Sequence, residues 1–136
     1  MAYVIKADVR DTDAGRFTFA EAKTMYGGKK IGAGDVAFLF ANETQGGHGL
    51  FARSVVVSVE ALAKPKGVDR WTPRVSVVVR RTGTAKRPLG RAELKRFANW
   101  KDGGAETELS FKVYRQSTNK ISGVSEKAAA FLEGFF

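Results

Sequence analysis

The sequence predicts an α+β protein in which a small, mostly antiparallel β-barrel carries two to three flanking helices. Strand-like runs rich in β-branched and aromatic residues recur along the chain, between turns rich in glycine. Two of these runs, residues 35–41 and 50–62, are joined by a turn of hairpin length, which favours antiparallel pairing. The length of 136 residues and the apolar content of 43% suit a single domain over residues 1–136 with one core.

Five segments are expected to form the strands. Residues 3–9 are short and rich in β-branched side chains. Residues 35–41 (DVAFLFA) are apolar on both faces, as is typical of a barrel strand that helices cover from outside. Residues 50–62 form a long strand in which valines alternate with polar residues. Residues 74–82 and 109–114 show the same alternation, which has the period of a strand.

Three helices are expected beside these strands. Thr18 and Glu21 match a capping box, which predicts a helix over residues 19–26. Pro88 fits the first turn of a second helix, which reaches to about residue 100. Ser125 is the predicted N-cap of the last helix. The apolar residues of this helix follow the i, i+3, i+4, i+7 spacing, and they are Ala128, Phe131, Leu132 and Phe135.

The composition offers few groups for catalysis or metal binding. The chain has no cysteine and one histidine, His48, which is too few nitrogen and sulfur ligands for a zinc site. No nucleophile is marked beside His48, so the sequence favours a binding protein over an enzyme. We therefore expect no catalytic residue, no metal and no cofactor. The segment GGKKIGAG departs from the nucleotide P-loop pattern, but its Lys29 and Lys30 can approach a phosphate.

The sequence carries no signal for secretion or membrane insertion. Its first residues lack the basic and apolar regions of a signal peptide, and the longest nearly apolar run, residues 55–62, is too short to span a bilayer. The absence of cysteine is compatible with a reducing compartment. We expect a cytoplasmic protein, monomeric and without a membrane partner.

The basic residues are concentrated in one segment. The formal net charge is +9, from 23 basic and 14 acidic residues, and a field of this sign attracts polyanions. Between residues 80 and 96, Glu93 is the only acid, and Arg91 and Lys95 are four apart on one face of the predicted second helix. The residues predicted to hold the phosphates of a nucleic acid are Lys29, Lys30, Arg80, Arg81, Lys86, Arg87, Arg91 and Lys95.

Aromatic and hydrogen-bonding side chains suggest where a base could bind. Proteins that read unpaired bases stack them on aromatic rings and bind their edges through hydrogen bonds. Trp71 stands beside Arg70 in a predicted loop, and Arg115 and Gln116 follow the predicted strand over residues 109–114. We expect Trp71, Arg115 and Gln116 to belong to a base pocket.

The segments GDVAFLFAN (residues 34–42) and GLFARSVVVSVE (residues 49–60) resemble the EVE domain. More broadly, they resemble the PUA-like superfamily, which also contains the ASCH and YTH domains. The resemblance implies a small pseudo-barrel that binds RNA, or DNA with a modified base, in a pocket between barrel and loops. By position in the matched strand, it implies that Phe40, Asn42 and Glu43 line this pocket.

Together these observations predict a module that binds nucleic acid, either RNA or DNA with a modified or flipped base. The basic residues would hold the phosphates, and the pocket would hold the base. Two alternatives remain open. One is an ASCH-like enzyme that acts on a nucleotide or RNA and uses a lysine with Glu43. The other is a protein–protein adaptor that uses the aromatic residues at positions 131–136.

Overall fold

The computed structural model describes residues 1–43, 48–115 and 119–136. Within these ranges, six strands close into a barrel in the order β1-β3-β4-β5-β2-β6. The strands are β1 (Ala2–Ala7), β2 (Arg16–Met25), β3 (Val36–Ala41), β4 (Gly49–Ala61), β5 (Arg74–Thr84) and β6 (Lys120–Val124). Neighbouring strands are antiparallel except for the pairs β1–β3 and β2–β6, which are parallel. The predicted fold class, a mostly antiparallel α+β barrel, is confirmed.

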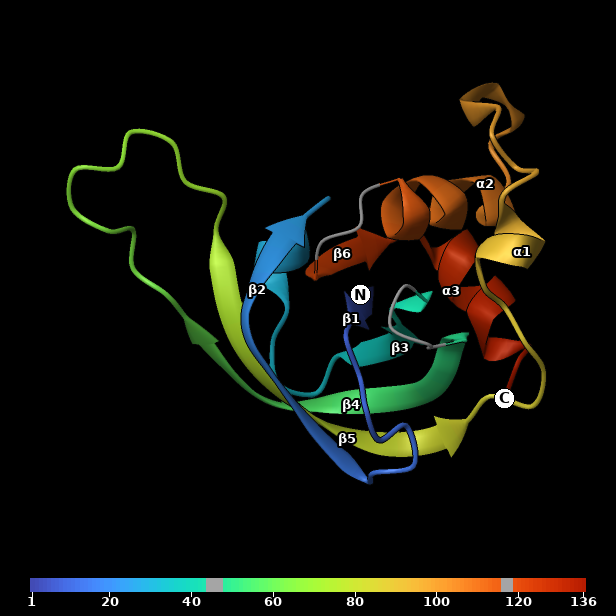
Figure 1. Ribbon diagram of the computed structural model, residues 1–136, viewed down its shortest axis with the longest axis horizontal. Coiled ribbons are helices and arrows are strands. Elements are labelled where there is room, and N and C mark those ends of the chain that lie inside the picture. Colours follow the sequence, from blue (N-terminus) through green and yellow to red (C-terminus); the bar gives the residue numbers. More distant parts are fainter. Residues whose placement is uncertain (44–47, 116–118) are drawn as a thin grey trace.

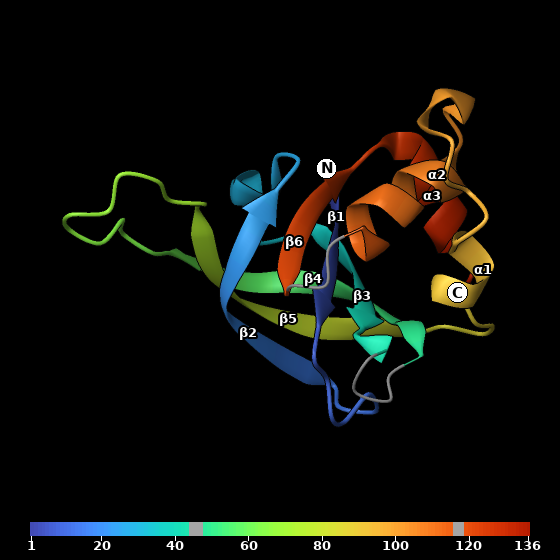
Figure 2. The ribbon, with the colours of Figure 1, turned by 45° about the horizontal axis from the view of Figure 1, so that its top comes forward.

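The helices gather on one side of the barrel, as Figures 1 and 2 show from two directions. They are α1 (Arg91–Leu94), α2 (Ala105–Leu109) and α3 (Glu126–Glu133), and α2 continues directly into a π-helical turn, η4 (Ser110–Tyr114). The structure also describes two 3₁₀ turns, η1 (Gly28–Lys30) and η3 (Trp100–Asp102). The loop from β4 to β5 extends on the opposite side of the barrel from the helices (Figure 1). In the described residues, no helix has the length and apolar character needed to cross a membrane.

Two apolar clusters hold the fold together, and alternation along the strands divides them. In β1, Tyr3 and Ile5 point into the barrel, whereas Val4 belongs to the cluster between barrel and helices. In β3, Leu39 packs in the barrel and Phe38 packs against the helices. This double burial explains why residues 35–41 are apolar on both faces, as predicted. The barrel therefore offers the helices an apolar wall on which they are fixed.

The helix predicted over residues 19–26 is wrong, because residues 19–25 belong to β2 and Tyr26 lies in the turn after it. Phe17 and Phe19 point into the barrel and pair with Val79 and Val77 of β5, so burial with the period of a strand outweighs the local capping signal. A bulge follows Phe19, with Glu21 at a φ of 52°. The bulge returns Ala22 to the barrel interior, and the capping-box interpretation therefore fails.

The strand predicted over residues 109–114 is also wrong, since these residues continue α2. Ala105, Leu109 and Val113 are buried at a spacing of four, which is the helical period, and they pack against the barrel. The helix predicted to reach about residue 100 is shorter than expected and covers only Arg91–Leu94. By contrast, α3 is confirmed. The Ser125 side chain accepts a hydrogen bond from the Ala128 backbone N–H at 3.1 Å, as an N-cap should.

Candidate functional site

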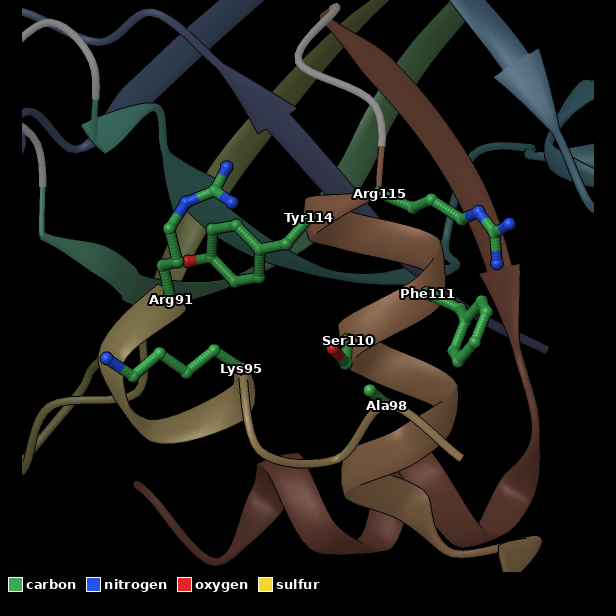
Figure 3. Close-up of a pocket in the computed structure, with 7 residues that line it drawn as sticks. All are labelled: Arg91, Lys95, Ala98, Ser110, Phe111, Tyr114 and Arg115. Carbon is green, nitrogen blue, oxygen red and sulfur yellow. The ribbon is translucent and has the colours of Figure 1, made fainter. Parts of the chain in front are cut away.

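A pocket of about 320 Å³ lies between α1 and η4. Figure 3 shows Arg91 and Lys95 on the α1 side, with Tyr114 and Ser110 facing them from η4. The full lining consists of Arg91, Lys95, Ala98, Ser110, Phe111, Tyr114 and Arg115. Phe111 and Arg115 point to the other side of η4, so the lining combines three cationic side chains with two aromatic rings in two groups. A π-helical turn is rare and frequently occurs at functional sites, and here it supplies most of one wall.

Glu43 attaches α1, which forms one wall of this pocket, to the barrel. It follows β3, and its carboxylate accepts a hydrogen bond from the Arg91 backbone N–H at 2.9 Å. The Gly90 N–H donates to the Glu93 carboxylate at 2.6 Å, so the first turn of α1 is capped from both sides. The Arg91 guanidinium consequently lies 5.1 Å from the centre of the Tyr114 ring. The Arg91 guanidinium and the Tyr114 ring are therefore already in contact in the protein without a ligand.

Gly49 permits a close approach behind the same pocket. It begins β4 at a φ of +80°, and a Cβ there would lie 2.4 Å from the Leu89 carbonyl oxygen and 2.9 Å from the Tyr114 hydroxyl. The Leu50 N–H donates to that Leu89 carbonyl at 2.9 Å. The backbone that leads into α1 is therefore fixed directly on β4, and only glycine fits at position 49 without a shift.

Tyr114 joins the pocket to the barrel. Its ring meets the Phe40 ring nearly at a right angle, with 6.3 Å between centres, and Phe40 is fully buried beneath it. The Tyr114 hydroxyl is buried and has no partner at hydrogen-bond geometry among the described residues. Burial first, and then the Glu43 carboxylate, raise the pKa of Tyr114 above its usual range. The hydroxyl therefore stays protonated, as a potential donor.

Two buried lysines lie behind Tyr114. Lys6 of β1 and Lys120 of β6 are register partners, and each is only 2% exposed. The Lys6 ammonium donates to the Val113 carbonyl at 3.1 Å and lies 4.8 Å from the centre of the Tyr114 ring. Burial lowers the pKa of Lys6. Burial, together with the charge of Lys6, lowers the pKa of Lys120 to about 8. This end of the barrel is thus positively charged in its interior as well as on its surface.

The lysine pair predicts a distinctive pH dependence of stability. Because the pKa of Lys120 is about 8 in the folded protein and near 10.5 in the unfolded chain, the unfolded state binds more protons between these values. The free energy of unfolding should therefore rise from pH 8 towards pH 10. Above pH 10 the raised pKa of Tyr114 acts in the opposite direction, because the unfolded chain then loses a proton that the folded protein keeps.

The measurement is urea unfolding at a series of pH values, with the variant Lys120→Met as the comparison. The variant should lack most of the rise between pH 8 and 10. Parallel curves for the two proteins across this window would contradict the assignment of the rise to Lys120.

The predicted pocket residues lie in three different places. Arg115 lines the pocket, Glu43 holds its α1 wall, and Phe40 lies beneath Tyr114 as part of the core. Asn42, at 8% exposed, is buried at the end of β3. Trp71 lies in the loop between β4 and β5, on the far side of the barrel, with its ring 5.4 Å from the Arg74 guanidinium (Figure 1). Gln116 lies outside the described residues.

The predicted phosphate-binding residues are also divided. Arg91 and Lys95 line the pocket, and the other six do not. Arg81 donates to the backbone carbonyls of Ala14 and Thr12, so its guanidinium fixes the turn before β2. Arg87 covers the Phe135 ring at 4.2 Å. The remaining four are exposed, on η1, on β5 and in the segment after β5, and they are Lys29, Lys30, Arg80 and Lys86.

Sequence reasoning missed several residues of this site. Ser110, Phe111 and Tyr114 belonged to a predicted strand, and the cue to their helical state was the spacing of four between the buried residues 105, 109 and 113. Lys6 was overlooked although a lysine amid the β-branched run YVIKA is an unusual choice for a barrel strand. The described residues contain no group of side chains suited to hold a metal ion.

The closed barrel with helices on one side is a PUA-like, EVE-related fold, as the sequence resemblance implied. The DUF55 domain of human thymocyte nuclear protein 1 is similar over 98% of this chain and 97% of its own length, with a TM-score of 0.65 and 13% identity. The same human protein, THYN1, in complex with DNA containing 5-methylcytosine, gives a TM-score of 0.62 at 13% identity over 98% and 95% of the two chains.

A bacterial structure, from Pseudomonas putida, gives a TM-score of 0.64 at 13% identity and covers 99% of both chains. At this level of identity the likeness is one of fold. No protein-family model and no curated protein sequence matches the chain.

Proposed function

We propose that the protein binds nucleic acid and holds an unpaired or flipped base in the pocket between α1 and η4. The observation that carries this proposal is the pairing of cations with rings in one cavity. Arg91 and Lys95 face the Tyr114 ring across a space of about 320 Å³, and Arg115 lies beside the Phe111 ring on the other side of η4 (Figure 3). A volume of this size is at the lower end of small-ligand sites, and a single base is a small, flat ligand.

Each part of the pocket suits a part of a nucleotide. Arg91 and Lys95 are exposed and can pair with phosphates, whereas the half-buried Phe111 ring can contact the face of a base. The buried Tyr114 ring forms the floor of the pocket beneath Arg91. Ser110 offers a hydroxyl that can donate to a base edge or accept from it. The acids near the pocket, Glu43 and Glu93, are already occupied by backbone N–H groups of α1. The pocket therefore keeps its positive character.

We further propose that the base is one that carries a modification or is extruded from a duplex. THYN1, which has the same fold, has been solved in complex with DNA containing 5-methylcytosine. The likeness to that protein supports a ligand of the same class, because the pocket here is too small for a base pair but suits one base. Duplexes with and without 5-methylcytosine, and an RNA of the same sequence, are the probes that decide which base and which backbone are preferred.

Binding should weaken steeply with salt if the exposed cations contact phosphates. Three contacts, from Arg91, Lys95 and Arg115, predict a slope of about −2 in a plot of log affinity against log salt for a single strand. Fluorescence anisotropy of a labelled oligonucleotide between 50 and 400 mM salt, a range of roughly one decade, measures this slope. The proposal fails if no oligonucleotide binds at the lowest salt, or if affinity is independent of salt.

The structure supports the two alternative functions, an enzyme and a protein–protein adaptor, less well than nucleic-acid binding. An enzyme that used a lysine with Glu43 would need the Glu43 carboxylate for its substrate, but that carboxylate accepts a hydrogen bond from the Arg91 N–H at 2.9 Å, and Lys6 is only 2% exposed. A protein–protein adaptor would need exposed aromatic residues at the C-terminus. There, Phe135 is 5% exposed and Phe136 packs against Phe38, with 5.9 Å between ring centres. We therefore retain nucleic-acid binding.

A further inference from the structure

Trp100 exposes a large aromatic ring beside the pocket, on turn η3 between α1 and α2. The residue is 56% exposed, and among the large apolar residues that the structure describes only Met1 is more exposed. Tryptophan is enriched at protein interfaces, where its large ring contacts a partner while its N–H finds a hydrogen-bond partner. Packing within the protein therefore leaves more than half of Trp100 accessible to a ligand.

The ring is held in place although it is exposed. It meets the Phe111 ring edge-on, with 4.9 Å between centres and 71° between the planes. The Asn99 side chain accepts a hydrogen bond from the Lys101 N–H at 3.1 Å, and the Asp102 N–H donates to the Asn99 carbonyl at 3.0 Å. These contacts fix the turn that carries Trp100. A ligand that stacked on the ring would lose little entropy in ordering it.

Phe111 connects Trp100 with the pocket. Phe111 and Arg115 both line the pocket, and Figure 3 shows them side by side along η4. The Arg115 guanidinium lies 4.8 Å from the centre of the Phe111 ring. Trp100, Phe111 and Arg115 therefore form a continuous row of flat groups, which we call the stacking row. It leads from the pocket to the exposed tryptophan.

The charges around the stacking row favour a polyanion. Lys101 is exposed on the same turn as Trp100, where Asp102 is the acid, and Lys95 is exposed on the opposite wall of the pocket. Beyond Trp100 a second hollow of about 290 Å³ contains Lys112, whose ammonium pairs with Glu108 at 3.0 Å. The free cations thus outnumber the free acids along the row. Flat rings flanked by cations are the arrangement that binds single-stranded nucleic acid.

We propose that Trp100 is a stacking platform for an unpaired base that neighbours, in the same strand, the base held in the pocket. This inference rests on the proposed function and extends it, because it assigns a second base position and requires single-stranded character on one side of the recognised base. Stacking of this kind accepts any base, so the second position contributes affinity more than sequence preference.

The chain contains two tryptophans, which gives a direct optical test. In the variant Trp71→Phe, Trp100 is the sole tryptophan, and a base stacked on its indole should quench its fluorescence strongly during titration with a short oligothymidine. The variant Trp100→Phe is the matched control, because only Trp71 then emits, from the far side of the barrel. Its fluorescence should not change in the same titration.

The affinity of the same oligonucleotide supplies a second readout. Trp100→Ala should weaken binding by about tenfold in an anisotropy titration, since one base–aromatic stack is worth roughly that factor. Trp71→Ala should leave the affinity unchanged. The fluorescence titration of Trp71→Phe leaves Trp100 unchanged, so it tests whether a base stacks on Trp100 even if Trp100→Ala folds poorly.

The outcomes separate this inference from the proposed function. The platform is disproved, while nucleic-acid binding stands, if two results are obtained together. Trp100→Ala binds the oligonucleotide with an unchanged dissociation constant, and the emission of Trp100 in Trp71→Phe is not quenched. If no oligonucleotide binds the unaltered protein at low salt, both proposals fall. If Trp100 emission shifts with protein concentration in the absence of oligonucleotide, the ring contacts a second protein copy and the inference is overturned.

Discussion

Reversing both charges of α1, in the variant R91E/K95E, is expected to lower the affinity for nucleic acid on the order of 100-fold at low salt. Each charge-assisted contact with a phosphate is worth about one factor of ten, and reversal removes two such contacts. Both side chains are exposed and line the pocket, so the fold should tolerate the change. The anisotropy titration described above measures the loss, and the salt slope should become shallower by about 1.4.

The matched control is K66E/R70E in the loop between β4 and β5. It changes one lysine and one arginine, as the test variant does, and alters the net charge equally. Both residues are exposed on the side of the barrel opposite α1, and Arg70 is the neighbour of Trp71 (Figure 1). The control should weaken binding only slightly. An equal loss in both variants would mean that the overall charge attracts the ligand and that the pocket has no special part.

Gly49→Ala is expected to destabilise the protein by about 3 kcal/mol, because two costs combine at this position. The φ of +80° is unfavourable for alanine, and the added Cβ would lie 2.4 Å from the Leu89 carbonyl oxygen and 2.7 Å from the Gly90 Cα. Backbone cannot yield as a flexible side chain can. The segment that leads into α1 would have to move, and Arg91 would move with it.

Gly67→Ala separates the two costs. Gly67 has nearly the same φ, +79°, but a Cβ there meets no atom within 4 Å. Gly67→Ala should therefore lower the free energy of unfolding by only about 1 kcal/mol, because only the left-handed conformation is unfavourable there. Urea unfolding of both variants measures the difference, and binding should be weaker in Gly49→Ala alone. Equal destabilisation of the two variants would refute the close approach between β4 and α1.

Elements of the fold could be predicted from the sequence where their local residue pattern agrees with their burial and pairing in the tertiary structure. The strands β1, β3, β4 and β5 were predicted because their apolar patterns match their burial in the barrel. In β2 the capping-box signal of Thr18 and Glu21 pointed to a helix, and pairing with β5 overrode it. The closing strand β6 gave little signal, because it contains Lys120, Ser122 and Gly123 and owes its burial to its neighbours.

The candidate site could be predicted only in part, for a similar reason. Arg91 and Lys95 were found from their spacing of four, which is kept because α1 begins at Arg91 and Lys95 is its C-cap in helical conformation. Trp71 was placed in the pocket because it is aromatic and stands beside an arginine, but the length and direction of a loop are decided by tertiary structure. Trp100 and Phe111 come together only through the helical path of residues 105–114, which the alternating pattern concealed.

The central claim is that ligand and protein meet at the pocket between α1 and η4. Amide hydrogen exchange of the protein, with and without a saturating oligonucleotide, tests it most directly. The account predicts slower exchange for the backbone of residues 91–101 and 109–115, and no change in residues 63–73 around Trp71. Protection confined to residues 63–73, with α1 and η4 unaffected, would contradict the account.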